Sequence, residues 1–317
     1  MTFPLRTAPP APLPGPQVLT EAEWTARRDH HHATVDELLA GHVARRAAGR
    51  SHPVHDFLFT YYSLRPNQLR RWHPGYGTVL LGASAVRDYR DHPGYERVAV
   101  DGVAGVRVAR EVLDRRADTV DFVARLLAAT ASRAPQLGCF GLHEWAMVYR
   151  AGADGVRHAA VPLRLGHTGT DAVVESMQLR CTHYDAFRFF TPAAAPRNAE
   201  ALTRDEQIRT EQPGCLHAGM DLYKWCYKML PLTDSALTVR CLRHAAAARE
   251  LDMRASPYDL EDYGYSPIRI ETAAGRAQYV REQSALTRRA AALRQELVNR
   301  CTALQAHRTT APENTGG

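Results

Sequence analysis

Lysine is nearly absent from this sequence, although the 317 residues include 40 lysines and arginines together. The two lysines, Lys224 and Lys228, both lie in the stretch from Cys215 to Met229. Arginine in place of lysine is typical of a GC-rich genome, in which lysine codons are scarce. A lysine in such a background can mark a position that needs a compact, titratable amine. The alternative interpretation is an ordinary solvated helix face.

Long apolar runs and paired cysteine motifs are also absent. Without a run of about 18 apolar residues, neither a membrane-spanning helix nor a membrane partner is expected. Residues 1–18 are proline-rich and have no apolar core segment, so no secretory signal peptide is expected. The six cysteines are widely spread without a C-x-x-C pair, which predicts reduced thiols in a cytoplasmic protein and argues against a thiolate zinc site.

Familiar catalytic motifs are missing as well. The sequence has no HExxH, GxSxG, GxGxxG or Walker A motif, and it lacks the His-x-Glu and Pro-Cys-x-x-Cys pattern of zinc deaminases. A serine or cysteine hydrolase therefore has no support. The apolar fraction of 45% and the charged fraction of 23% are ordinary for a globular protein. The net charge of +6 permits an anionic partner such as DNA, but an arginine-rich composition raises the charge without any function.

The order of predicted elements indicates an α+β fold that is mainly α-helical. We expect disordered tails at 1–18 and 309–317, which enclose a single globular domain at 19–308. Thr20 and Glu23 form a capping box at the start of a long first helix. An apolar stripe predicts a helix over 118–132. Further helices are predicted near 203–211, 216–229, 234–254 and 273–306.

A small antiparallel β-hairpin is predicted in the middle of the chain. Residues 158–165 and 172–182 alternate in polarity and carry β-branched side chains, and Gly166-His167-Thr168-Gly169 lies between them. Short strands are also predicted at 79–81 and 97–100.

Three short segments combine a histidine with an acid among apolar residues. They are His143-Glu144, His183-Tyr184-Asp185, and His217 with Asp221. Buried ionisable groups require partners, so convergence of the three segments would create a polar site for acid–base chemistry or for a metal ion. His217 and Asp221 stand four residues apart, a spacing that can chelate one ion on a helix. The candidate metal ligands are His143, Glu144, His183, Asp185, His217 and Asp221.

The region around Lys224 indicates a different chemistry. On a helix, His217, Asp221, Lys224 and Lys228 share one face, so an amine and a carboxylate could enter one pocket. The candidate catalytic residues are Asp185, Asp221, Glu144 and Lys224. Aromatic and basic side chains for a substrate are predicted in the loop at 65–75, after the His183 segment, beside Lys224 and in the loop at 255–272. These candidate substrate-binding residues are Arg65, Arg70, Trp72, Arg188, Trp225 and Tyr258.

Five sequence blocks carry a resemblance to a known family. They are FLFTYYSLRPNQLRRWHPGYG, GCFGLHEWAMVYR, HYDAFRFFTPAA, CLHAGMDLYKWCYKM and ELDMRASPYDLEDYGYSPIRIET. As a set they resemble actinobacterial proteins labelled 3-methyladenine DNA glycosylase, over most of residues 20–300. The resemblance implies removal of alkylated purine bases from DNA. The chain lacks the helix-hairpin-helix glycine pattern and its following catalytic aspartate, so no catalytic residue is transferred.

Three hypotheses follow. The first is a DNA glycosylase-like hydrolase without a cofactor, in which Asp221 or Asp185 stabilises positive charge on the sugar. The second is a metal-dependent enzyme that acts on a small molecule with iron, zinc or manganese held by the histidines and acids. The third is a non-catalytic nucleic-acid-binding protein, which leaves the buried histidine and acid segments without a role.

Overall fold

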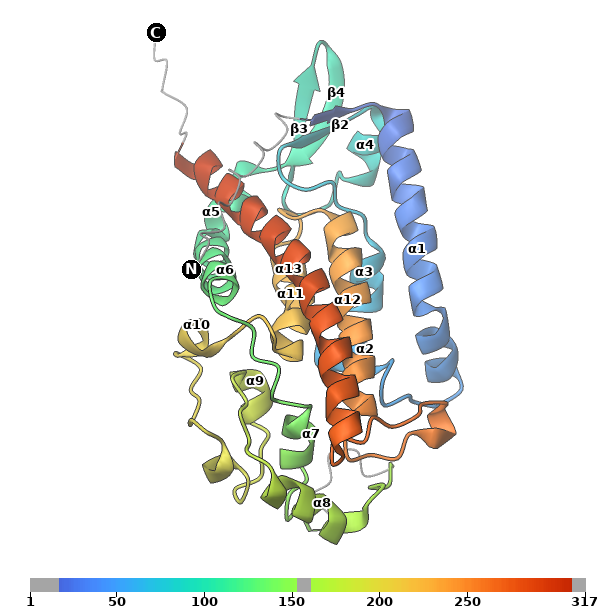
Figure 1. Ribbon diagram of the computed structural model, residues 1–317. Coiled ribbons are helices and arrows are strands. Elements are labelled where there is room, and N and C mark those ends of the chain that lie inside the picture. The colour runs from blue at the N-terminus through green and yellow to red at the C-terminus, as the bar shows by residue number, and fades with distance from the viewer. Residues whose placement is uncertain (1–16, 153–160, 310–317) are drawn as a thin grey trace.

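The polypeptide is mainly helical and carries a small mixed sheet at one end (Figure 1). The computed structural model describes residues 17–152 and 161–309. Its α-helices are α1 Glu21–Ala47, α2 Phe57–Tyr61, α3 Pro66–Arg70, α4 Ala83–Asp88, α5 Arg110–Arg115, α6 Ala117–Ala131, α7 Leu142–Ala146, α8 Gly166–Ser176, α9 Tyr184–Phe187, α10 Gln207–Thr210, α11 Leu216–Lys228, α12 Ser235–Arg254 and α13 Ala273–Thr309. Its strands are β1 Gln17–Leu19, β2 Thr78–Leu81, β3 Tyr95–Val100 and β4 Val103–Val108.

Helices α11, α12 and α13 pack against one another and form the centre of the molecule (Figure 1). Gly219 of α11 lies where the three meet, because an added Cβ there would be 3.0 Å from His244 Nε2 and 3.7 Å from Ala290 Cβ. Helix α6 covers α13 and buries its predicted stripe of Val120, Val123 and Leu126. Since α11 is enclosed on most sides, polar side chains on it must find partners inside the protein.

The long first helix confirms its predicted start. Thr20 Oγ1 accepts a hydrogen bond from the Glu23 backbone, and the Glu23 carboxylate accepts one from the Thr20 backbone at 2.9 Å. Helix α1 packs on α3, α12 and β2 and thereby joins the sheet to the helical centre. Asp56 ties its C-terminal half to the following loop by accepting from His42 Nδ1 at 2.9 Å, Arg45 Nε at 3.2 Å and the His52 backbone at 2.8 Å.

The sheet has the strand order β1-β2-β4-β3, in which β1 and β2 are parallel and the other pairs antiparallel. Strands β3 and β4 form a hairpin whose turn residues, Asp101 and Gly102, have φ of +49° and +78°. Those values match the Asp-Gly turn that suits the twist of a two-residue hairpin. The predicted strands at 79–81 and 97–100 are confirmed, whereas β1 and β4 were not predicted.

The fold class is confirmed as mainly helical α+β, but the predicted hairpin at 158–182 is wrong. Residues 166–176 form α8, and residues 153–160 lie outside the described part of the chain. The β-branched Thr170, Val173 and Val174 fit a helix as well as a strand, because their spacing buries all three on one helical face. Around α8, Leu163 and Leu179 take part only in isolated bridges, with Tyr258 and Asn198.

The predicted tails need correction at their inner ends. Gln17 and Val18 belong to β1 and pair with Thr78 and Val79, so the ordered chain begins before residue 19. Thr309 is the last residue of α13. The rest of both predicted tails, 1–16 and 310–317, lies outside the described residues. Among the helices that the structure describes, none combines the length and the apolar character that a bilayer crossing requires.

The Asp56 contacts predict a pH-dependent contribution to stability. Burial raises the pKa of Asp56, but hydrogen bonds from Arg45 and His42 outweigh it and lower that pKa to about 2. Because the folded pKa lies below the unfolded value, the contribution is complete above about pH 4 and is lost as the pH falls toward 2. We expect Asp56→Asn to lower the free energy of unfolding by about 2 kcal/mol at pH 7.

Urea unfolding at pH 7 and at pH 3 would measure this contribution. The loss of unfolding free energy in Asp56→Asn, relative to the wild type, should be smaller at pH 3 than at pH 7. Asp36→Asn is the control, because Asp36 makes an ion pair with Arg70 in which both side chains are about half exposed. Such pairs contribute little. Equal losses in the two variants, or a loss in Asp56→Asn that does not change with pH, would contradict the prediction.

Candidate metal centre

Two groups of buried histidines and acids lie side by side where α7, α9, α11 and α12 meet. We call His143, His217 and Asp252 the first triad, and His183, Glu211 and Asp221 the second triad. In each triad the potential ligand atoms all lie within 4.8 Å of one another. The ring centroid of His217 is 4.4 Å from that of His143 and 5.4 Å from that of His183. The three predicted segments therefore converge, which was the condition that the sequence left open.

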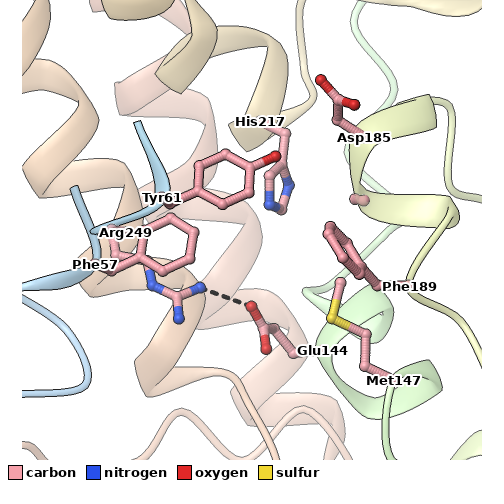
Figure 2. A pocket seen from close by; sticks show the side chains of 9 residues that line it. Phe57, Tyr61, Glu144, Met147, Asp185, Phe189, His217 and Arg249 are labelled. Atoms are coloured by element: carbon pink, nitrogen blue, oxygen red, sulfur yellow. Dashed lines mark hydrogen bonds and ion pairs between the residues drawn. The ribbon is translucent and has the colours of Figure 1, made fainter. Parts of the chain in front are cut away.

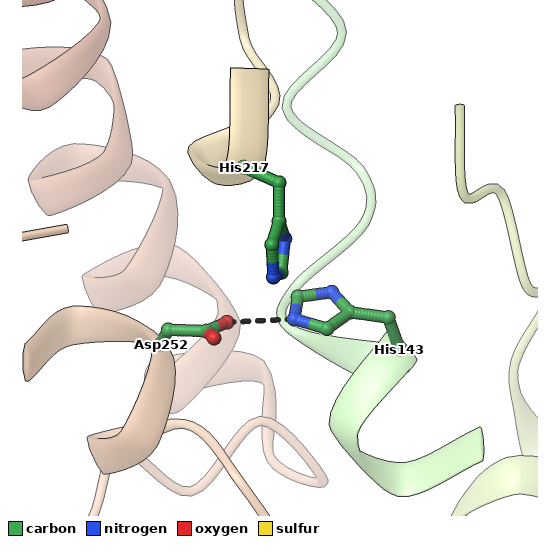
Figure 3. Close-up of side chains that lie close together, drawn as sticks. All are labelled: His143, His217 and Asp252. Atoms are coloured by element: carbon green, nitrogen blue, oxygen red, sulfur yellow. Dashed lines mark ion pairs between the residues drawn. The ribbon is translucent and has the colours of Figure 1, made fainter. Parts of the chain in front are cut away.

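The first triad is assembled from three helices (Figure 3). His143 lies on α7, His217 on the first turn of α11 and Asp252 near the end of α12. His143 Nε2 is 2.8 Å from Asp252 Oδ1, and the rings of His143 and His217 meet edge to face at 83°. The other ring nitrogen of His143, Nδ1, faces Cys139 Sγ at 3.7 Å. The Nε2 atom is therefore the one directed toward the interior of the triad.

The protonation states within the first triad are set by burial and by neighbouring charge. Burial opposes protonation of His143, but the Asp252 carboxylate beside it outweighs burial and raises the pKa of His143 well above its usual value. Burial likewise opposes ionisation of Asp252, and the charge of His143 reverses this and lowers the pKa of that carboxyl. Burial and the neighbouring His143 lower the pKa of His217 to about 3. His217 is therefore neutral and offers a lone pair, as a metal ligand must.

Arg249 compensates the negative charge around the first triad. Its side chain is 1% exposed, and Nη1 donates to Glu144 Oε1 at 2.6 Å and to Asp252 Oδ2 at 3.1 Å. Figure 2 shows the guanidinium beside the Phe57 ring, whose centroid is 4.0 Å from Arg249 Cζ. Glu144 was predicted as a metal ligand or catalytic acid, but it forms an ion pair with Arg249 and lies outside both triads.

The second triad is equally buried. His183 precedes α9, Glu211 follows α10 and Asp221 lies in the middle of α11. His183 Nδ1 is 3.5 Å from Glu211 Oε1, and His183 Nε2 is 3.3 Å from Asp221 Oδ2. The Tyr62 hydroxyl donates to Asp221 Oδ1 at 3.0 Å. Burial and the neighbouring Asp221 raise the pKa of Glu211 to about 7.

Lys224 bridges two carboxylates at the edge of the second triad. Its Nζ donates to Asp185 Oδ2 at 3.0 Å and to Asp221 Oδ2. Burial would lower the pKa of Lys224, but Asp221 and Asp185 outweigh it and raise that pKa. The amine therefore holds its proton, which disfavours the nucleophilic role considered from the sequence. Lys228, which was expected on the same face, is exposed and lies over the Trp225 ring.

A narrow cleft with a free volume of about 10 Å³ lies beside this region (Figure 2). His217 of the first triad lines it, together with Glu144, Arg249 and Asp185. Its apolar walls are Phe57, Tyr61, Met147, Ala186 and Phe189. The cleft thus has a ligand of the first triad in its lining, and its free volume is that of about one water molecule.

Several buried atoms of the triads lack hydrogen bonds. In the part of the chain that the structure describes, His143 Nε2, Asp252 Oδ1 and His183 Nδ1 have no hydrogen-bond partner with acceptable geometry. His143 Nε2 and Asp252 Oδ1 are nevertheless only 2.8 Å apart. Buried polar atoms are normally hydrogen-bonded, so the poor hydrogen-bond geometry between these two atoms is unusual for a protein interior. The two atoms lie within metal-ligand reach, and a metal ion bound there would replace the proton that His143 holds between them.

The donor sets also fit metal ions. Two histidines and one carboxylate, as in the first triad, form the set found in non-haem iron sites and in catalytic zinc sites. One histidine and two carboxylates, as in the second triad, form a harder set that suits manganese or iron. Sequence spacing did not predict either set of ligands. It predicted that His217 and Asp221 bind one ion together, whereas His217 belongs to the first triad and Asp221 to the second.

The predicted substrate-binding residues lie mostly away from the cleft, and none of them lines it. Trp72 is buried and stacks on Trp24 at 6.4 Å between ring centroids, and Arg70 makes an ion pair with Asp36. Arg65 is exposed and precedes α3.

The remaining three predicted residues are held by other groups. Arg188 Nε lies 3.3 Å from Asp185 Oδ1, and the Arg188 side chain is partly exposed. Trp225 is buried against Phe122 and beneath both lysines, and Tyr258 is fully buried in a separate apolar cluster. As they stand, Trp72, Trp225 and Tyr258 are not available for stacking on a base.

Three residues of this candidate site were missed in the sequence. Asp252 and Arg249 lie on the buried side of α12, and Glu211 follows the short helix α10. Asp252 stands between the apolar residues Leu251 and Met253, a setting that could have marked it as a buried acid.

Comparison of the whole chain with protein families, curated proteins and solved structures finds no match.

The position of Arg249 predicts a strong effect of its removal. Arg249→Met removes the buried guanidinium that compensates the buried Glu144 and that donates to Asp252, so we expect a loss of about 3–5 kcal/mol in the free energy of unfolding. Arg240→Met on the same helix is the matched control, because the Arg240–Glu296 pair is partly exposed and should contribute less than about 1 kcal/mol. Guanidinium unfolding of both variants measures the difference. Comparable losses would show that Arg249 does not compensate buried charge.

Proposed function

We propose that this protein is a metal-dependent enzyme that acts on a small molecule bound in the cleft. The proposal depends on one observation above all. The first triad presents two imidazoles and a carboxylate whose potential ligand atoms lie within 4.8 Å of one another, and its His217 lines the cleft. Iron, zinc and manganese are the metals that this donor set accepts.

A divalent ion held by His143, His217 and Asp252 would supply Lewis acidity to an oxygen of the substrate or to a bound water. Each ligand is oriented by its own neighbours. Cys139 contacts Nδ1 of His143, and Arg249 donates to the second oxygen of Asp252. Such supporting contacts fix ring and carboxylate orientation and contribute about 10- to 100-fold to metal affinity.

The cleft residues would bind the substrate. Phe57 and Tyr61 stack on one another at 4.8 Å between ring centroids, and with Phe189 they form apolar walls. Burial raises the pKa of Asp185, but the ammonium of Lys224 outweighs it and holds that pKa below the usual value. Asp185 is therefore ionised at the edge of the cleft, where its charge would stabilise positive charge on a bound substrate.

Metal content tests this function. We expect purified protein, reconstituted with iron, zinc or manganese and freed of loose ions, to retain at least about one equivalent per chain. His217→Ala and Asp252→Asn should each reduce binding at the first triad by more than about tenfold, because each removes a ligand. Elemental analysis and equilibrium dialysis provide the measurement.

Two variants control for loss of a buried group elsewhere. His31→Ala removes a buried histidine whose Nε2 contacts the Leu69 carbonyl at 3.0 Å, and Asp56→Asn removes a buried carboxylate near α1. Both should retain the wild-type metal content. A wild-type protein that retains none of the three metals, or control variants that lose metal as the triad variants do, would refute the proposal.

A second candidate is the removal of alkylated purines from DNA, which the family resemblance implies. One observation favours it. The stacked Phe57 and Tyr61 and the facing Phe189 line the cleft beside the carboxylates Asp185 and Glu144, which is the type of surroundings that a flipped base requires. The burial of Trp72 and Trp225 argues against the stacking residues first expected.

Release of free base from methylated DNA would test the second candidate. Release by metal-stripped protein that is lost in Asp185→Asn would favour the glycosylase over the metal-dependent enzyme. No release from methylated DNA, by stripped or by metal-loaded protein, would exclude it. Asp205→Asn serves as the control for Asp185→Asn, because Asp205 is exposed and outside the cleft.

A further inference from the structure

The second triad has the features of a binding site in its own right. His183, Glu211 and Asp221 come from three separate segments, and their side chains are 1%, 2% and 3% exposed. Their potential ligand atoms lie within 4.8 Å of one another, and His183 Nδ1 has no hydrogen bond in the described part of the chain. His183 presents Nδ1 to Glu211 and Nε2 to Asp221, so a metal ion there would be bound by one ring nitrogen together with carboxylate oxygens.

The second triad brings carboxylates from separate segments close together. Asp185 lies near Lys224, Arg188 and Arg204, and Asp221 lies near Lys224. Glu211 accepts its hydrogen bond from the neutral Gln207.

We infer that His183, Glu211 and Asp221 bind a second divalent metal ion beside the one assigned to the first triad. This inference rests on the proposed function, because it makes the centre a two-metal site. Supporting contacts are already in place, since the Tyr62 hydroxyl donates to Asp221 and the Gln207 amide donates to Glu211. Contacts of this kind orient carboxylate ligands in metal sites.

Helix α11 places the two sites next to each other. It contributes His217 to the first triad and Asp221 to the second, four residues later and one helical turn away. The ring of His217 lies within 5.4 Å of the ring of His183. One imidazole and two carboxylates favour manganese or iron, so Mn²⁺ is the suitable probe for the second site.

The test is titration of metal-stripped protein with Mn²⁺ alone, followed by equilibrium dialysis and electron paramagnetic resonance. The wild type should bind about two equivalents, and the signals of neighbouring ions should be broadened by their interaction. Glu211→Gln and His183→Gln should each bind about one equivalent and show the resolved hyperfine pattern of an isolated ion. Glu206→Gln is the control, because Glu206 makes its contacts with Thr203 and Arg209 at the surface and should behave as the wild type does.

The outcomes separate this inference from the proposed function. A single Mn²⁺ that is retained in Glu211→Gln and lost in Asp252→Asn would overturn the second site and leave the proposed function standing. A single Mn²⁺ that is lost in Glu211→Gln and retained in Asp252→Asn would support the second site and refute the first. No binding of Mn²⁺ by the wild type would overturn the second site. Circular dichroism of each variant shows whether it folds, and the wild-type stoichiometry decides the question even if one variant does not.

Discussion

The pairing of buried charges around α11 and α12 is the constraint on which the rest of the structure depends. Arg249, Glu144 and Asp252 are removed from water together, and so are Lys224 and Asp221. A buried ion without its partner destabilises a fold by several kcal/mol. The segments that carry these groups must therefore meet in one arrangement, which fixes α7 and the loops around α9 and α10 against the helical centre.

The same need to pair buried charges applies to the two triads. The interior of this protein satisfies most of its charges with short ion pairs, such as that between Arg249 and Glu144. His143 and Asp252 form such a pair at 2.8 Å but with poor hydrogen-bond geometry, and His183 Nδ1 lies 3.5 Å from Glu211 without a hydrogen bond in the described part of the chain. Functional sites are among the places where such departures occur.

The helical framework was largely predictable from the sequence, because its signals are local. The capping box at Thr20 and the apolar stripe of α6 predicted helices that the structure confirms. The hairpin at 158–182 was wrong, since Val173 and Val174 fit either period and burial favoured α8. The hairpin that does exist was missed, although Asp101-Gly102 is a strong turn signal.

The site was predictable only in part. The sequence indicated that His143, His183 and His217 each lie in a buried polar segment, but it did not show whether the segments meet, and the structure brings them together. Their carboxylate partners could not be assigned from spacing, because they depend on how α11 packs. The N-terminal turn of α11 brings His217 to Asp252 of α12, while the next turn directs Asp221 toward Glu211. Arg65, Arg70 and Trp72 formed a plausible basic and aromatic loop in the sequence, but Trp72 is buried beneath Trp24.

The most direct test of the metal centre is a crystal structure of the metal-loaded protein, with anomalous diffraction recorded at the absorption edge of the bound metal. We predict an anomalous peak in the first triad, within bonding distance of His143 Nε2, of a carboxylate oxygen of Asp252 and of a ring nitrogen of His217. The absence of a peak there, with His143 and Asp252 joined by an ordinary hydrogen bond, would contradict the account.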